Sequence, residues 1–128
     1  MDQSANKALG QKGEKLAARF LEKNGHTLVS TNFRSGRSEL DIISVIDKTL
    51  VVSEVKSFHS DPLGAAEFRV TKSKQKQIIQ GAYGFLDKNP EYQGYDVRLD
   101  VIIVDFSQYP AQITQHKSAF YDDQNYFY

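Results

Sequence analysis

Residues 38–57 read SELDIISVIDKTLVVSEVKS, and this segment has the strongest structural signal in the chain. Aliphatic and β-branched residues dominate both of its halves, so residues 38–46 and 49–57 are expected to form two strands. Asp47 and Lys48 separate the strands and fit the loop of a two-residue hairpin. Apolar residues occupy both faces of the strand pair, which indicates a central position in a sheet covered on both sides.

Charged residues gather on one face of this expected hairpin. In the two-residue register, Asp41 lies opposite Glu54, and Glu39 lies opposite Lys56. Opposed side chains are about 5 Å apart at Cβ, so Asp41 and Glu54 are close enough to hold one cation. Without a cation, two opposed carboxylates would destabilise the ladder. The pair is therefore a candidate site for Mg²⁺ or Mn²⁺, hard ions that prefer oxygen ligands.

Two further residues extend the candidate site. Lys56 lies one pleat beyond the second acid, where it could position an attacking water or stabilise charge on a phosphate. Glu14 borders the buried side of an amphipathic helix expected over residues 3–24. Gly10 and Gly13 stand beside Glu14, and they are expected to allow close packing of this helix against the sheet.

The rest of the chain supplies the other expected elements. They are a strand at 27–33, a basic turn at 34–37, a loop marked by Pro62 and Gly64, a helix at 71–88 capped by Thr71, a strand at 95–106 and an edge strand at 111–116. The order α-β-β-β-α-β-(β) predicts an α/β (α+β) fold, with a central mixed sheet flanked by helices. One domain is expected over residues 1–128, with a peripheral tail at about 117–128.

Composition limits the functions that the chain can have. It has no cysteine, which excludes disulfides, thiolate metal ligands and thiol nucleophiles. No segment is long and apolar enough to span a bilayer, and the polar start lacks a signal core, so a cytoplasmic protein without membrane contact is expected. A net charge of zero weakens a nucleic-acid assignment. It does not exclude one, since residues 1–86 carry 13 Lys and Arg against 9 Asp and Glu.

Four motifs together resemble a known family. They are G-x-x-G-E-x-x-A at 10–17, SELDII at 38–43, SEVKS at 53–57 and RLDVI at 98–102. The combination resembles the YraN family of small bacterial proteins over nearly the whole chain. Those proteins look like nucleases of the PD-(D/E)XK superfamily, with a restriction-endonuclease-like core. Within that superfamily they most resemble archaeal Holliday-junction resolvases.

The resemblance implies a role for each matching residue. Asp41 and Glu54 would be metal ligands, with Glu14 as the helical acid near the metal. Lys56 would be the catalytic lysine, and the lysine of the second helix falls on Lys74. A homodimer is expected if the resolvase analogy holds, because resolvases act on two-fold junctions.

Two departures and one strand pair qualify the resemblance. Ser38 stands where the pattern has a glycine, and Ser57 and Phe58 stand where it has Thr-Arg. An arginine there would contact phosphate, so its absence is expected to lower phosphate affinity more than metal binding. Arg98 and Asp100 match a later strand of the pattern, but they share one strand face and could simply pair with each other.

Simpler interpretations compete with a functional one. Glu39 and Lys56 could form an ordinary cross-strand ion pair on a solvated hairpin. Four basic residues are candidates for phosphate contacts in a nucleic-acid interface: Lys72, Lys74, Arg34 and Arg37. Charge runs are usually solvated surfaces, and Lys74 differs because it lines up with Ile78 on the apolar side of its helix.

Three hypotheses follow from the sequence. The first is an Mg²⁺- or Mn²⁺-dependent endonuclease that hydrolyses phosphodiesters of nucleic acid, with DNA favoured and branched DNA suggested by the resolvase resemblance. The second is a binding module that keeps the fold and the acids but binds nucleic acid or a protein partner without turnover. The third is a structural or interaction protein that uses the acidic C-terminal third and the aromatic tail. Phosphate binding should weaken steeply with salt, whereas a protein–protein role through apolar surface should not.

Overall fold

The computed structural model of the chain describes residues 3–122. Its elements, in order, are α1 (Gln3–Lys23), β1 (Thr27–Ser35), β2 (Ser38–Ile46), β3 (Thr49–Phe58), α2 (Pro62–Glu67), α3 (Lys72–Lys88), the 3-10 turn η1 (Pro90–Tyr92), β4 (Asp96–Asp105) and β5 (Gln112–Phe120). The predicted α+β order is confirmed, with α2 and η1 as additions.

The five strands form one mixed sheet in the order β1-β2-β3-β4-β5. Every neighbouring pair is antiparallel except β3 and β4, which run parallel. A parallel pair needs a crossover connection, and here α2 and α3 lie within it. The edge strand predicted at 111–116 is confirmed as β5, and β1 forms the opposite edge of the sheet.

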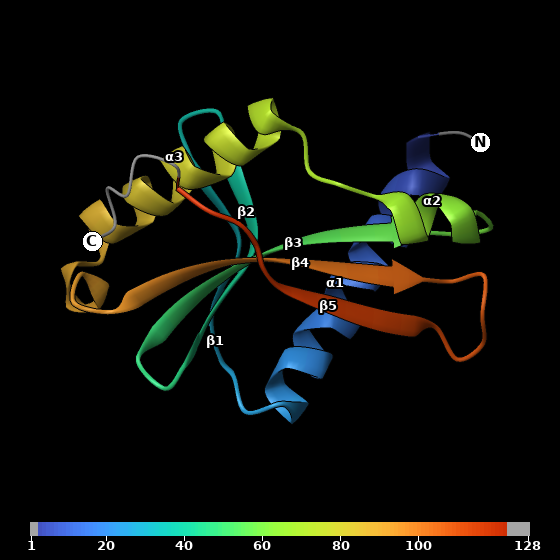
Figure 1. The fold of residues 1–128 in the computed structure, drawn as a ribbon, viewed down its shortest axis with the longest axis horizontal. Helices are drawn as coiled ribbons and strands as arrows, with labels where there is room; N and C mark the ends of the chain where they lie inside the picture. The colour runs from blue at the N-terminus through green and yellow to red at the C-terminus, as the bar shows by residue number, and fades with distance from the viewer. Residues whose placement is uncertain (1–2, 123–128) are drawn as a thin grey trace.

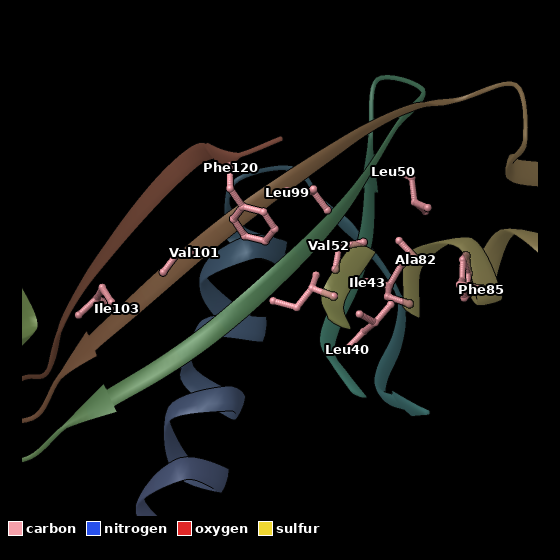
Figure 2. Packing of buried hydrophobic residues seen from close by; sticks show 11 residues of the cluster. Leu40, Ile43, Leu50, Val52, Ala82, Phe85, Leu99, Val101, Ile103 and Phe120 are labelled. Carbon is pink, nitrogen blue, oxygen red and sulfur yellow. The ribbon is translucent and has the colours of Figure 1, made fainter. Parts of the chain in front are cut away.

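Helices cover the two faces of the sheet, as Figure 1 shows for α1 and α3. The larger apolar cluster lies between α3 and the sheet, and Figure 2 shows ten of its residues labelled: Leu40, Ile43, Leu50, Val52, Ala82, Phe85, Leu99, Val101, Ile103 and Phe120. The smaller cluster joins α1 to the other face through Ala17, Leu21, Ile42, Ile102 and Val104. Because both faces are packed, the central strands carry apolar residues on both of their faces.

The β2–β3 hairpin has the predicted two-residue loop. Asp47 and Lys48 both have positive φ, 48° and 58°. Such a loop matches the twist of the flanking strands and fixes their register. The pairs run from Ile46–Thr49 to Ile42–Ser53, which is the predicted register.

The segment expected to be a loop around Pro62 contains α2. Asp61 caps this short helix by accepting a hydrogen bond from the Gly64 amide at 2.8 Å, and Pro62 occupies the first turn. Proline is well suited to that position because its missing N–H is unpaired there anyway. The proline and glycine that suggested a loop are thus features of a helix start.

The last strand is longer than predicted. β5 continues to Phe120, whose ring is buried in the larger cluster, so residues 117–120 belong to the sheet rather than to a peripheral tail. The β4–β5 register shifts between Leu99 and Val101, and Ser118 has a positive φ of 52°. This irregularity is typical of a β-bulge, which sequence periodicity does not reveal. Most of the aromatic tail, residues 123–128, lies outside the described part of the chain.

Among residues 3–122, no helix combines the length and the apolar character needed to cross a bilayer.

Candidate metal and phosphate site

The candidate site lies where β2 and β3 separate. Their pairing stops at Ile42–Ser53, and Figure 2 shows β2 diverging from β3 toward Leu40. Just beyond that pair, the Val55 amide donates to Asp41 Oδ2 at 2.8 Å. The side chain of Asp41 therefore provides the acceptor that a further ladder partner would have provided.

Asp41 and Glu54 meet at this fork, as the sequence predicted. Glu54 is largely enclosed, with 13% of its side chain exposed. Burial, a hydrogen bond between the two carboxyl groups and the charge of Asp41 together raise the pKa of Glu54 to about 9, against the opposing charges of Lys74 and Lys56. A buried carboxyl with a strongly raised pKa beside a second acid is a common feature of functional sites.

Lys74 reaches the same acid from α3. Thr71 caps this helix, its hydroxyl accepting from the Lys74 amide at 3.2 Å, as predicted. Lys74 Nζ lies 3.8 Å from Glu54 Oε2, an ion-pair distance that is too long for a hydrogen bond. Glu54 Oε2 is buried and has no hydrogen-bond partner. The site therefore has a buried oxygen with unused acceptor capacity.

A cavity of about 390 Å³ lies over these groups. Its lining consists of Glu14, Asp41, Glu54, Val55, Lys56, Phe68, Arg69, Val70, Thr71 and Lys74. The three acids and two lysines that carry the proposed chemistry thus share one cavity. Lys56 is exposed and contributes through its charge.

Glu14 enters the cavity from α1 because this helix approaches β3 closely. A Cβ on Gly13 would overlap Ser57 Oγ, so only glycine fits there without a shift. Burial raises the pKa of Glu14, the charge of Asp41 adds to the rise, and a hydrogen bond from Asn32 opposes it. The close packing predicted at Gly13 is confirmed. The same prediction is wrong for Gly10, where a Cβ would meet no neighbour within 4 Å.

Glu39 does not face Lys56, which corrects the sequence prediction. The β2–β3 ladder has ended before this point, so the expected pair cannot form. Glu39 instead pairs with Arg34 of β1, with Arg34 Nη2 3.1 Å from Glu39 Oε2. With its amide nitrogen turned toward the acids, Asn32 donates to Glu39 Oε1 at 3.3 Å and to Glu14 Oε2 at 3.2 Å.

Arg98 and Asp100 pair with each other, which was the simpler interpretation. Arg98 Nε and Nη2 each donate to Asp100 at 2.9 Å. Asp100 is completely buried and also accepts from Gln115 Nε2 at 3.1 Å and from the Ser118 amide at 3.0 Å. These contacts fasten β4 to the bulge of β5, and neither residue lines the cavity.

The other predicted phosphate contacts do not line the cavity. Arg34 is engaged with Glu39 at the surface, and Arg37 and Lys72 are exposed. Their role in binding nucleic acid stays a prediction. Sequence reasoning missed Arg69, which lines the cavity from the segment between α2 and α3. The one signal for it was a basic residue just before the Thr71 cap.

The donor set suits a hard divalent ion in part. Among residues 3–122, no three His, Cys, Asp or Glu side chains converge into a complete metal cage. Asp41 and Glu54 supply two carboxyl groups, one with an unpartnered buried oxygen. That matches Mg²⁺, which often binds one or two carboxylates and fills its other positions with water and phosphate. A metal at this site would be held by Asp41 and Glu54, with Glu14 nearby.

The fold and the site define a small α+β domain with paired acids at a strand fork. Residues 13–104 match the family model described as "Uncharacterised protein family UPF0102", and the chain belongs to this family. This is the YraN-type family that the motifs predicted.

Curated relatives agree with this assignment. The chain is 41% identical over 101 residues to a UPF0102 protein of Chloroherpeton thalassium, covering 79% of this chain and 78% of that protein. It is 38% identical over 115 residues to one of Geobacter metallireducens, covering 90% and 93%. It is 39% identical over 107 residues to one of Acinetobacter baumannii, covering 84% and 80%.

Proposed function

We propose that this protein is a divalent-metal-dependent nuclease that hydrolyses phosphodiester bonds, with DNA as its substrate. The observation that carries the proposal is the Asp41–Glu54 pair, in which Glu54 is largely enclosed and has one buried oxygen without a hydrogen-bond partner. Lys56 and Lys74 line the same cavity. Acids that hold a cation and lysines that meet phosphate are the groups this chemistry needs.

Each residue has a distinct role in the proposed reaction. Asp41 and Glu54 bind the metal ion, and Glu14 adds negative charge beside them. When bound, the ion supplies positive charge that stabilises a phosphoryl group as it is attacked. Lys56 orients the attacking water or donates to a phosphate oxygen. Lys74, whose Nζ lies 3.8 Å from Glu54 Oε2, favours the ionised form of Glu54 that binds the ion.

The form of the DNA substrate rests on resemblance. Similarity to resolvases favours branched DNA, together with a homodimer that presents two such sites to a two-fold junction. The zero net charge implies that phosphate contacts are local rather than spread over the surface.

Calorimetric titration tests the metal site first. Mg²⁺ and Mn²⁺ should bind the wild type, and binding should be lost in Asp41→Asn and Glu54→Gln. Glu22→Gln, an exposed acid of α1 outside the cavity, is the matched control and should bind metal normally. Absence of metal binding in the wild type, with and without DNA, would contradict the proposal.

Cleavage assays then test the reaction. With Mg²⁺ or Mn²⁺, the wild type should cut labelled branched DNA faster than linear duplex, and both acid variants should be inactive. Lys56→Met should bind metal but lose most activity, because the lysine acts on phosphate or water rather than on the ion.

One observation favours a second function, a binding module without turnover. Lys74 lies within ion-pair distance of Glu54, so a cation of the chain itself already offsets part of the charge of this acid. If metal binding is absent but DNA binding persists and weakens with salt, this second function replaces the first.

A further inference from the structure

A second cavity lies next to the candidate site. It has a volume of about 220 Å³ and is lined by Phe68, Arg69, Val70, Gln75, Val101, His116, Ala119 and Phe120. Phe68, Arg69 and Val70 line this cavity and the larger one. The short segment between α2 and α3 therefore forms a wall between two adjoining hollows.

The wall is held in place on both sides of Arg69. The ring of Phe68 packs edge-on against Phe58, with centroids 6.0 Å apart. Gln75 Nε2 donates to the Val70 carbonyl at 3.0 Å, which ties the segment to the first turn of α3. Phe68 and Val70 also pack against the larger apolar cluster. Arg69 is thus an exposed side chain on a fixed backbone.

Arg69 differs from Arg34 and Lys74 in lacking an acid partner. Arg34 and Lys74 are engaged with Glu39 and Glu54. Within residues 3–122, no carboxylate lies at ion-pair distance from Arg69, whose Nη1 donates to the Phe68 carbonyl at 2.7 Å. A guanidinium has five N–H donors, so most of its donor capacity is available to a ligand.

We propose that Arg69 binds the phosphate next to the scissile one, and that the 220 Å³ cavity takes the base of the adjoining nucleotide. A planar guanidinium binds phosphate through two parallel hydrogen bonds. Because Arg69 lines both cavities, a strand with its scissile phosphate at Asp41 and Glu54 would reach Arg69 on the way to the smaller cavity. This inference rests on the proposed function and names a substrate subsite for it.

The size and lining of the smaller cavity suit one nucleobase. Its volume is below the roughly 300–1,000 Å³ of pockets that enclose a drug-sized ligand. The lining combines the aromatic Phe68 and Phe120 with the polar Gln75 and His116. Aromatic contacts with positive charge beside them are typical of single-strand recognition without sequence preference.

Binding of a short labelled single-stranded DNA oligonucleotide, measured by fluorescence anisotropy over a range of salt concentrations, tests the phosphate contact. Arg69→Ala should weaken binding roughly tenfold and reduce the salt slope by about 0.7, the value for one lost phosphate contact. Arg69→Lys should keep the slope but lose part of the affinity, because lysine retains the charge without the paired donors. Arg19→Ala, an exposed arginine of α1 outside both cavities, is the matched control.

Filling the smaller cavity tests the base subsite. Ala119→Phe places a ring at an exposed position of its lining and should weaken oligonucleotide binding several-fold. Calorimetric Mn²⁺ binding should be unchanged in Ala119→Phe, because Ala119 does not line the cavity that holds the acids.

The outcomes separate this inference from the proposed function. If the wild type binds the oligonucleotide and Arg69→Ala binds it equally well with the same slope, the inference is wrong and the proposed function stands. If the wild type binds metal but no DNA in any form, the proposed function fails and the inference fails with it.

Discussion

The backbone amide of Val55 donates to Asp41 Oδ2 across 2.8 Å at the point where β2 and β3 stop pairing. The carboxylate thereby satisfies a backbone group that the diverging strand leaves without a ladder partner. The charge of the same side chain also helps to raise the pKa of Glu54. Asp41 therefore contributes to the stability of the fold and to the candidate metal site. Substitutions at Asp41 can separate its effect on stability from its effect on metal binding.

Asp41→Ala should lower the free energy of unfolding by about 1–3 kcal/mol, the cost of leaving a partly buried amide without its acceptor. Asp41→Asn keeps an oxygen that can accept from Val55 and should cost less. Both variants should lose metal binding. Urea denaturation compared with metal titration measures the two effects, and equal stability of Asp41→Ala and wild type would show that the Val55 hydrogen bond contributes nothing.

Glu54 should make stability fall as pH rises. Its pKa in the folded protein, about 9, is above its ordinary value of 4.5. Between these values the folded state holds a proton that the unfolded state releases, so each rise in pH in this window favours unfolding. Below pH 4.5 Glu54 is protonated in both the folded and the unfolded state, so it causes no loss of stability. Above about pH 9 Glu54 is ionised in both states, and the loss of stability has reached its full value.

Glu54→Gln should remove this pH dependence, since the amide does not titrate. At about pH 8 the variant should be more stable than wild type by at least about 1 kcal/mol, the equivalent of one pKa unit. Urea denaturation at several pH values measures the difference. Added Mg²⁺ should stabilise the wild type more as pH rises, because the ion must displace the proton. A flat pH profile in the wild type would contradict the raised pKa.

The Arg98–Asp100 pair should matter for stability and not for the site. Asp100→Ala leaves the partly buried Arg98 without its partner and removes the acceptor for the Ser118 amide. Breaking a buried ion pair in this way costs about 3–5 kcal/mol. Thermal denaturation should show the loss. Where Asp100→Ala remains folded, its metal affinity should equal that of the wild type. Loss of metal binding in a folded Asp100→Ala variant would show that Asp100 contributes to the site.

The β2–β3 register could be predicted because it is set locally. Two residues between two apolar runs restrict the loop to the left-handed conformation that Asp47 and Lys48 adopt. That register brings Asp41 to Glu54. The error at Glu39 has a different origin, since the point at which β2 leaves β3 depends on how β1, α1 and α3 pack around the strands. No periodicity within residues 38–57 contains that information.

Arg69 was missed because its position, too, depends on tertiary packing rather than on local sequence. Its place in the site depends on Phe68 packing against Phe58 and on Gln75 holding Val70, contacts that span α2 and the crossover. Phe58 stands where the family resemblance led us to expect an arginine. In the folded chain its ring supports the segment that carries a different arginine into the cavity.

Gly13→Ala should destabilise the protein, while Gly10→Ala in the same helix should stabilise it. A methyl group on Gly13 would overlap Ser57 Oγ, so the hydroxyl would have to rotate, and it would lie 3.2 Å from Ser57 Cβ, a contact tight enough to press α1 away from β3. Overpacking of this kind costs about 1–3 kcal/mol. Gly10 has open space around it, and alanine there should add about 0.5–1 kcal/mol through helix propensity.

A double-mutant cycle with Ser57→Ala separates the contact from general effects on α1. Removing the hydroxyl relieves the shorter clash and leaves the 3.2 Å contact, so Gly13→Ala should cost less in the Ser57→Ala background. Urea denaturation of the four proteins gives the coupling energy. Because Gly13 packs against Ser57 of β3 and Glu14 beside it lines the cavity of the acids, Gly13→Ala should also weaken metal binding where Gly10→Ala does not. Equal metal affinity in both variants would mean that the position of α1 does not influence the acids.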